Sequence, residues 1–151
     1  AIPQNYTDLK LVASVRGTRA NYVCNLMLTF NGSSSSYSDV YLYGDGSAAA
    51  SGKDTNVTGY EYIYGTANSA TANSFSNFEI YIPNYASGNY KTFSTDSVTE
   101  SNTASYNNTG LLGSGLWANA APITSISIAQ DTATNINQYS TATLYGIKAE
   151  V

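Results

Sequence analysis

Acidic side chains are the residues of this chain with the clearest capacity for catalysis. The chain has ten Asp and Glu residues but no histidine, so it lacks the commonest general base and the commonest metal ligand. A glycosidase needs two carboxyl groups about 5 to 10 Å apart, one of them with a raised pKa. Paired carboxylates are therefore the route to catalysis that this composition leaves open.

Two pairs of carboxylates can be tested against that distance. Asp96 and Glu100 are four residues apart, which on a strand is about 13 Å and too far for joint action on one bond. Glu61 and Glu79 fall on separate predicted strands and would meet only across a sheet. No nucleophile–base signature accompanies either pair, and we predict that the chain is not an enzyme.

Asp45 and Asp54 are the candidates for a metal site, because they bracket a glycine-containing loop. β-Sandwiches can hold Ca²⁺ with loop carboxylates and carbonyls, although this spacing matches no EF-hand. An Asp-Gly dipeptide is more often a turn. We therefore favour a turn over a metal site, and the sequence predicts no cofactor.

Tyrosine is the residue type that most suggests a binding surface. The chain has 14, and a ring with a polar tip suits both sugar stacking and protein interfaces. Alternatively, tyrosine fills wide cores and edges in a chain with few Phe and Trp residues, and the sequence leaves both readings open. The candidates for a binding surface are Tyr41, Tyr43, Tyr60, Tyr62, Tyr64, Tyr85 and Tyr90.

The charge balance excludes several partners. Six Lys and Arg residues oppose ten Asp and Glu residues, for a net charge of −4, and the cations form no basic stripe of the kind that nucleic acid requires. The longest apolar stretches are a few residues, far short of the roughly 20 that a membrane-spanning helix needs. The single cysteine, Cys24, cannot form an internal disulfide, and no signal peptide is expected after Ala1.

The composition predicts an all-β fold. Ser, Thr, Asn and Tyr make up 67 of the 151 residues, while helix formers are scarce. Thr and Tyr suit a pleated, half-buried surface, and Asn, Ser and Gly suit turns. The length fits one domain, and no linker or shift in composition divides it, so we expect a single domain over residues 1–151.

Period-two alternation predicts eight or nine short strands. The segments with this pattern are residues 8–15, 22–30, 37–43, 58–64, 78–83, 90–100, 123–128 and 138–149. Residues 44–54 are predicted to be a long loop, and residues 101–117 are interrupted by glycines. Within 58–64, the tyrosines alternate with Gly59, Glu61 and Ile63. Phe93 and Val98 have opposite parity, which predicts a bulge over residues 94–96.

This count and spacing predict two packed antiparallel sheets in a jelly-roll-like β-sandwich, with a closed barrel as the alternative. One face of each antiparallel strand should pack inward while the other meets water. The residues that alternation assigns to the core are Leu9, Leu11, Leu26, Leu28, Phe30, Phe78, Ile80, Ile82, Ile126, Ile128 and Leu144.

Several segments resemble a β-rich domain of tailed-bacteriophage virion proteins. They are residues 2–14, 28–32, 79–85, 115–117, 123–128 and 139–147, short patches that together extend over nearly the whole chain. The resemblance implies a non-enzymatic structural protein on the virion surface, either a capsid decoration or fibre protein or a tail component. A carbohydrate- or receptor-binding module of a tail fibre is the alternative. The family supplies no catalytic residues.

We also expect a homo-oligomer. Strand faces rich in Tyr, Ser and Thr with little charge have the composition of interface cores, and few Lys or Pro residues are present to protect the sheet edges. Closed cyclic assembly would cover such edges. The resemblance implies a homotrimer in contact with other virion proteins and with a host surface glycan. A monomer is the alternative.

Overall fold

The structure, a computed structural model, describes residues 1–102, 109–130 and 134–149. Over these ranges the chain forms ten β-strands and no helix, so no described segment is a helix that could cross a membrane. The strands are β1 (Asp8–Val15), β2 (Val23–Phe30), β3 (Tyr37–Gly44), β4 (Ala49–Val57), β5 (Tyr60–Thr66), β6 (Ser76–Ile82), β7 (Lys91–Thr99), β8 (Thr109–Trp117), β9 (Ile126–Gln130) and β10 (Thr141–Ile147).

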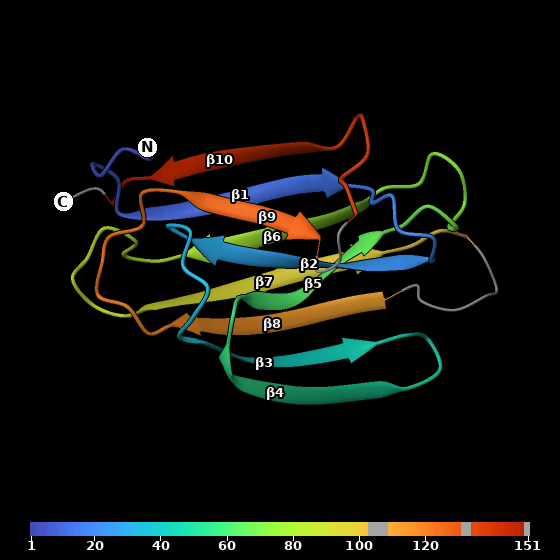
Figure 1. The fold of residues 1–151 in the computed structure, drawn as a ribbon, viewed down its shortest axis with the longest axis horizontal. Helices are drawn as coiled ribbons and strands as arrows, with labels where there is room; N and C mark the ends of the chain where they lie inside the picture. The colour runs from blue at the N-terminus through green and yellow to red at the C-terminus, as the bar shows by residue number, and fades with distance from the viewer. Residues whose placement is uncertain (103–108, 131–133, 150–151) are drawn as a thin grey trace.

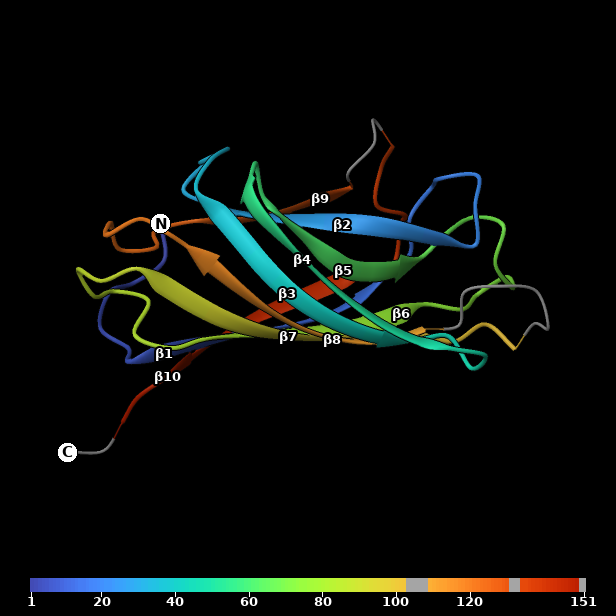
Figure 2. The same ribbon diagram turned by 90° about the horizontal axis from the view of Figure 1, so that it is seen from below.

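The strands form two antiparallel sheets that face each other (Figures 1 and 2). The larger sheet has seven strands in the order β10-β1-β6-β7-β8-β3-β4, and the smaller has three in the order β5-β2-β9. In Figure 1 the smaller sheet lies over the middle of the larger one, with β10 beyond it on one side and β3 and β4 beyond it on the other. The predicted all-β fold with two antiparallel sheets is confirmed. Both sheets have free edges, so the barrel alternative is wrong.

The core lies between the two sheets, and strict alternation builds it. In β6, Phe78, Ile80 and Ile82 are buried while the residues between them are exposed. Buried residues also alternate along β1 and β2, although the residues between them are mostly half-buried there. The predicted core residues that the structure buries are Leu9, Leu11, Leu26, Leu28, Phe30, Phe78, Ile80 and Ile82.

Aromatic rings join the sheets at one end of the core. Phe30 of β2 meets Phe93 of β7 edge-on at 5.4 Å between ring centroids, and it lies 5.7 Å from Trp117 of β8. The Tyr37 hydroxyl accepts a 2.8 Å hydrogen bond from the Phe30 backbone N–H, so its polar tip is satisfied inside the core. Gly115 of β8 leaves room for the Phe93 ring, which a β-carbon there would overlap.

Residues 44–54 are not one long loop, contrary to the prediction from the sequence. β4 pairs with β3 along its whole length, and only a short turn connects them. The Asp45 carboxylate closes this turn by accepting the backbone N–H groups of Ser47 and Ala48 at 2.9 and 2.8 Å. Most of β4 is exposed. An edge strand of this kind needs no apolar face, which is why it shows no alternation and raises the strand count to ten.

Three further predictions are wrong. β7 pairs with β8 without interruption, so there is no bulge over residues 94–96, and Val98 simply points outward. Ile126 and Ile128 are only partly buried, because β9 is an edge strand of the smaller sheet. Leu144 is 39% exposed, because β10 lies beyond the area that the smaller sheet covers (Figure 1).

The structure has irregular pairing at two other places, between β3 and β4 at Asn56 and between β2 and β5. Leu28 is opposite Tyr60 and Leu26 is opposite Ile63, so β5 has one residue more than β2 over this interval. The extra residue turns Ile63 into the core next to Tyr60, and Tyr62 is left half-buried at the edge. The predicted alternation of tyrosines against Ile63 is therefore wrong beyond the bulge.

Two cations are buried and are held by backbone carbonyls. The Arg16 guanidinium donates to carbonyl oxygens at four positions in the loop 68–74. The Lys91 ammonium donates to carbonyl oxygens in the turn 87–89, and burial lowers the pKa of this amine. Hydrogen bonds to a charged donor are stronger than neutral ones, so each cation fixes one loop against the end of a strand.

Leu28→Ala should lower the free energy of unfolding by about 2 to 5 kcal/mol, because Leu28 is fully buried between the sheets and its truncation leaves a cavity. Urea denaturation followed by circular dichroism measures the change. Leu112→Ala on the exposed face of β8 is the matched control and should change stability by less than about 0.5 kcal/mol. Equal effects of the two substitutions would contradict the assignment of the core.

Candidate functional site

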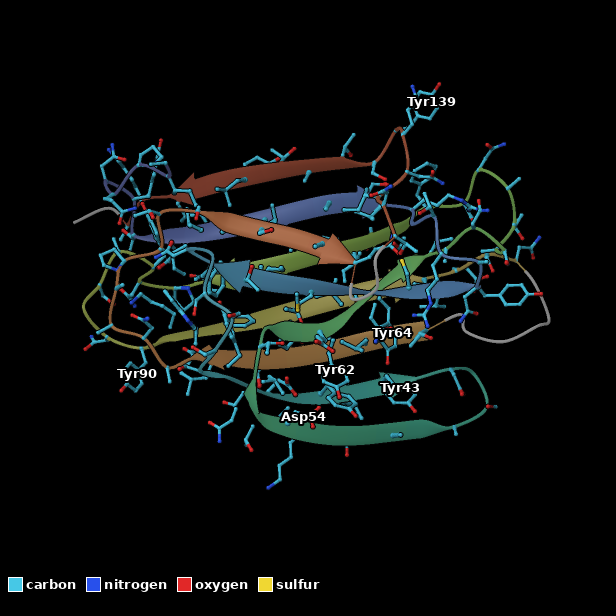
Figure 3. All side chains as sticks on the ribbon, in the orientation of Figure 1. Tyr43, Asp54, Tyr62, Tyr64, Tyr90 and Tyr139 are labelled. Atoms are coloured by element: carbon cyan, nitrogen blue, oxygen red, sulfur yellow. The ribbon has the colours of Figure 1, made fainter. Side chains whose placement is uncertain are left out.

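The structure separates the seven candidate tyrosines. Tyr60 and Tyr85 are buried in the core, and both hydroxyls form hydrogen bonds there. Tyr90 is exposed and lies well apart from the others (Figure 3). The four tyrosines that gather between β3 and β5 are Tyr41, Tyr43, Tyr62 and Tyr64, which we call the tyrosine flank.

The tyrosine flank lies where the smaller sheet ends above the larger one. Alternation along β3 directs Tyr41 and Tyr43 to the inner face. Figure 3 shows Tyr43 beyond the area that β5 covers. Tyr62 and Tyr64 come from β5, the edge strand of the smaller sheet. Amphipathic rings are suited to this position, since they cover apolar surface while their hydroxyls reach water.

Tyr41 and Tyr62 form a strut between the two sheets. Their rings stack with centroids 3.5 Å apart and planes at 19°. The Tyr62 hydroxyl donates to a carboxylate oxygen of Asp54 at 2.5 Å, and burial is the main cause that raises the pKa of this phenol. Gly52, opposite Tyr41 in β4, leaves the space into which that ring folds. Since the rings of Tyr41 and Tyr62 cover each other, they offer less surface to a ligand than Tyr43 and Tyr64 do.

Tyr43 and Tyr64 line an open pocket of about 420 Å³. Burial raises the pKa of Tyr64, and the nearby phenols of Tyr43 and Tyr41 raise it further. The remaining walls come from the loop before β2, from β2 itself, from the β3–β4 turn and from β8. These wall residues are Arg19, Asn21, Val23, Asn25, Asp45 and Thr109.

The loop that supplies two of these walls is held by backbone hydrogen bonds. The Arg19 carbonyl accepts the Asn68 N–H at 3.0 Å, and the Asn21 carbonyl accepts the Ser69 N–H at 2.9 Å. The loop 67–70 is itself tied to the buried Arg16 guanidinium. From the sequence this segment is only a polar connection. Its approach to the tyrosines depends on contacts between residues far apart in the chain, and no local signal predicts it.

Asp39 is a buried carboxylate that the sequence analysis missed. It lies opposite Asp54 on the inner face of the β3–β4 pair and accepts the Asp54 backbone N–H at 3.2 Å. The pKa of Asp39 is raised to about 6, mainly by burial and also by the negative charges of Asp54 and Glu61, which together outweigh the lowering by the Asp54 N–H hydrogen bond. Its place in the alternation of β3, on the same face as Tyr41 and Tyr43, was a signal that could have identified it.

The carboxylate pairs considered from the sequence do not come together in one pocket. Glu61 belongs to the smaller sheet and Glu79 to the larger, so they do not meet across a sheet. Glu79 points outward from β6, opposite Asp96, and forms a 2.8 Å ion pair with Lys10. Asp96 lies in β7 and Glu100 directly follows this strand, so the two carboxylates remain four residues apart on one extended segment.

Asp45 and Asp54 also lie apart. Asp45 is in the β3–β4 turn, and Asp54 is five residues beyond the start of β4, about 16 Å along the strand. Among the residues that the structure describes, no group of three or more His, Cys, Asp or Glu side chains could hold a metal ion.

Comparison of the chain with protein-family models, with curated proteins and with solved structures finds no match in any of the three.

Asp39→Asn should stabilise the protein at neutral pH and leave it nearly unchanged below pH 4. A carboxyl whose pKa is higher in the folded than in the unfolded state stabilises the fold when protonated, and that stability is lost as the pH rises through about 6. The asparagine side chain is uncharged at every pH, like the protonated carboxyl of Asp39, so the variant does not lose this stability as the pH rises. One unit of pKa is worth about 1.4 kcal/mol, which limits the gain at pH 7.5 to about 3 kcal/mol.

Urea denaturation of the wild type and of Asp39→Asn from pH 4 to pH 7.5 measures this difference. Asp96→Asn on the exposed face of β7 removes the same charge and serves as the control. A constant difference between the wild type and Asp39→Asn over the whole pH range would show that Asp39 does not titrate as described.

Proposed function

We propose that this chain is a non-enzymatic structural protein of a bacteriophage virion, displayed on the particle surface as a capsid decoration, fibre or tail component. We further propose that the two-sheet fold belongs to the jelly-roll-like sandwiches. The segments that resemble phage virion domains include most of β1 and β6 and the whole of β10. The observation that carries the proposal is the exposure of apolar side chains on β10, an edge strand of the larger sheet.

β10 is exposed on both faces, although it carries large apolar side chains. Leu144 on the inner face is 39% exposed and Tyr145 on the outer face is 53% exposed. No charged residue occurs from Thr141 to Ile147, whereas the opposite edge, β4, carries Lys53 and Asp54. Proteins commonly protect a free edge with charge, proline or cover, and β10 has none of these among the described residues.

We assign this edge to contact with a second copy of the same chain. A different edge strand of the neighbouring copy can extend the larger sheet at β10, a head-to-tail contact that can close into a ring, and the uncovered Leu144 and Ile147 would then be buried. Closed symmetry is the usual form of homo-oligomers. The number three rests on the resemblance alone, and we propose a homotrimer.

The proposed absence of catalysis is supported by the way the acids are used. The buried Asp39 is enclosed between the sheets near Tyr60, and Asp54 is held by the Tyr62 hydroxyl. Release of reducing ends from a bacterial surface polysaccharide, abolished by Asp39→Asn, would contradict this part of the proposal.

Antibodies raised against the chain should label the surface of intact virions in immunogold electron microscopy. Particles disrupted to release internal proteins serve as the comparison and should not gain further label. Labelling of soluble protein alone, with bare intact particles, would contradict the proposed location.

The isolated chain at micromolar concentration should sediment near 48 kDa, three times the 16.0 kDa of one copy. Tyr145→Lys should shift it to 16 kDa, because a charge on β10 would have to be desolvated in the contact. Tyr90→Lys places the same charge at another exposed tyrosine and should leave the mass unchanged. A wild type of 16 kDa, or a Tyr145→Lys variant of unchanged mass, would end the assignment of β10.

The second candidate is a carbohydrate- or receptor-binding module of a tail fibre, with a host surface glycan as partner. The pocket between Tyr43 and Tyr64 favours it, since an aromatic pair with polar neighbours suits a ligand that is part apolar and part hydroxyl.

A further inference from the structure

We infer that the pocket between Tyr43 and Tyr64 binds an uncharged saccharide. The inference rests on the second candidate function above and goes further, because it names the chemical class of the ligand and the side chains that hold it. The pocket volume, about 420 Å³, falls within the roughly 300 to 1,000 Å³ that is typical of small-molecule sites.

The two tyrosines supply the apolar part of the site. A sugar ring has faces of C–H groups and a rim of hydroxyls, so it is recognised by an aromatic ring and by hydrogen-bonding groups around it. Tyr41 and Tyr62 stack on each other, whereas Tyr43 and Tyr64 both line the pocket. Figure 3 shows Tyr43 and Tyr64 close to each other. The pair comes from two different sheets, which gives the pocket two aromatic walls.

The polar rim suits hydroxyl groups. The Asn25 amide can both donate and accept, as adjacent hydroxyls require. The Asn21 side-chain oxygen accepts the Tyr22 N–H at 2.8 Å, which fixes the amide and leaves its N–H groups as donors. The β3–β4 turn occupies Asp45 Oδ1, which leaves Oδ2 as an acceptor.

The charges in the pocket favour an uncharged ligand. Arg19 and Asp45 contribute one positive and one negative charge to the lining, so neither sign prevails. The chain as a whole carries a net charge of −4, which opposes the approach of an acidic polysaccharide. Both observations favour a neutral glycan over a sialylated, uronate or sulfated one.

The other hollows of the described surface are less suited to this role. The groove on the outer face beside Leu42 and Leu112 is lined mainly by apolar side chains and glycines. The hollow near Tyr139 contains Arg16, but both terminal nitrogens of its guanidinium already donate to loop carbonyls. The pocket of the tyrosine flank joins aromatic walls to polar groups on loops that the fold holds in place.

The test is a glycan array that carries neutral hexose and N-acetylhexosamine oligomers beside sialylated, uronate and sulfated ones. The strongest neutral oligomer is then titrated by calorimetry against the intact chain. We expect the wild type to bind neutral oligomers and no acidic ones. Tyr43→Ala and Tyr64→Ala should each weaken binding by about tenfold or more, since each removes one aromatic wall.

Asn25→Ala keeps both rings and should still weaken binding severalfold, which separates loss of recognition from loss of fold. Thermal unfolding of each variant checks the fold, and Tyr90→Ala, at an exposed tyrosine apart from the pocket, should bind as the wild type does. Tyr145→Lys should lose assembly but keep glycan binding, so that failure of this inference and failure of the proposed assembly give different results. Binding of acidic glycans only, no binding to any glycan, or unchanged affinity in Tyr43→Ala and Tyr64→Ala would overturn it.

Discussion

The fold is governed by the unequal width of its two sheets. Three strands cannot cover seven, so the sealed core lies only beneath β5, β2 and β9 (Figure 1). The contact of Phe30 with Phe93 and Trp117 holds the narrow sheet in place, and the missing side chain of Gly115 permits it. Two flanks of the wide sheet, β10 on one side and β3 with β4 on the other, lie beyond the smaller sheet. The inner face of each flank is covered to a different extent.

At the flank of β3 and β4, tyrosine side chains of the chain itself cover the inner face of the wide sheet. The stacked pair of Tyr41 and Tyr62 closes the gap between β3 and β5, and the next pair along remains open as a pocket. At the other flank β10 exposes leucine, isoleucine and tyrosine to solvent and contains no charged residue of its own. Low charge density, which leaves most contacts to rings, hydroxyls and amides, therefore has different consequences on the two sides: a pocket lined by aromatic and polar side chains, and an apolar edge suited to another protein surface.

Alternation predicted the strands whose one face is buried, because burial imposes a period of two on the sequence. Leu26, Leu28 and Phe30 were assigned correctly for this reason. The pattern fails for edge strands: β4 has no buried face to reveal it, and Leu144 has the right parity but lies beyond the smaller sheet. The tyrosine-rich strands were predicted from the sequence to carry a binding surface, and the proposed pocket includes Tyr43 and Tyr64 of these strands. The pocket walls at residues 19–25 were not predicted, because only the folded chain brings them to Tyr43.

The pairing of β1 with β10 has a mechanical consequence. Asp8 at the start of β1 lies opposite Ile147 at the end of β10, and the chain termini leave from this same end of the molecule (Figure 1). Antiparallel hydrogen bonds run perpendicular to the strands, so a force pulling Asp8 away from Ile147 loads them one after another rather than all at once. Under tension β10 unzips from β1, and the inner strands bear no load until β10 has detached. The strand that we propose for subunit contact is thus also the first to detach when Asp8 and Ile147 are pulled apart, unless a neighbour holds its outer edge.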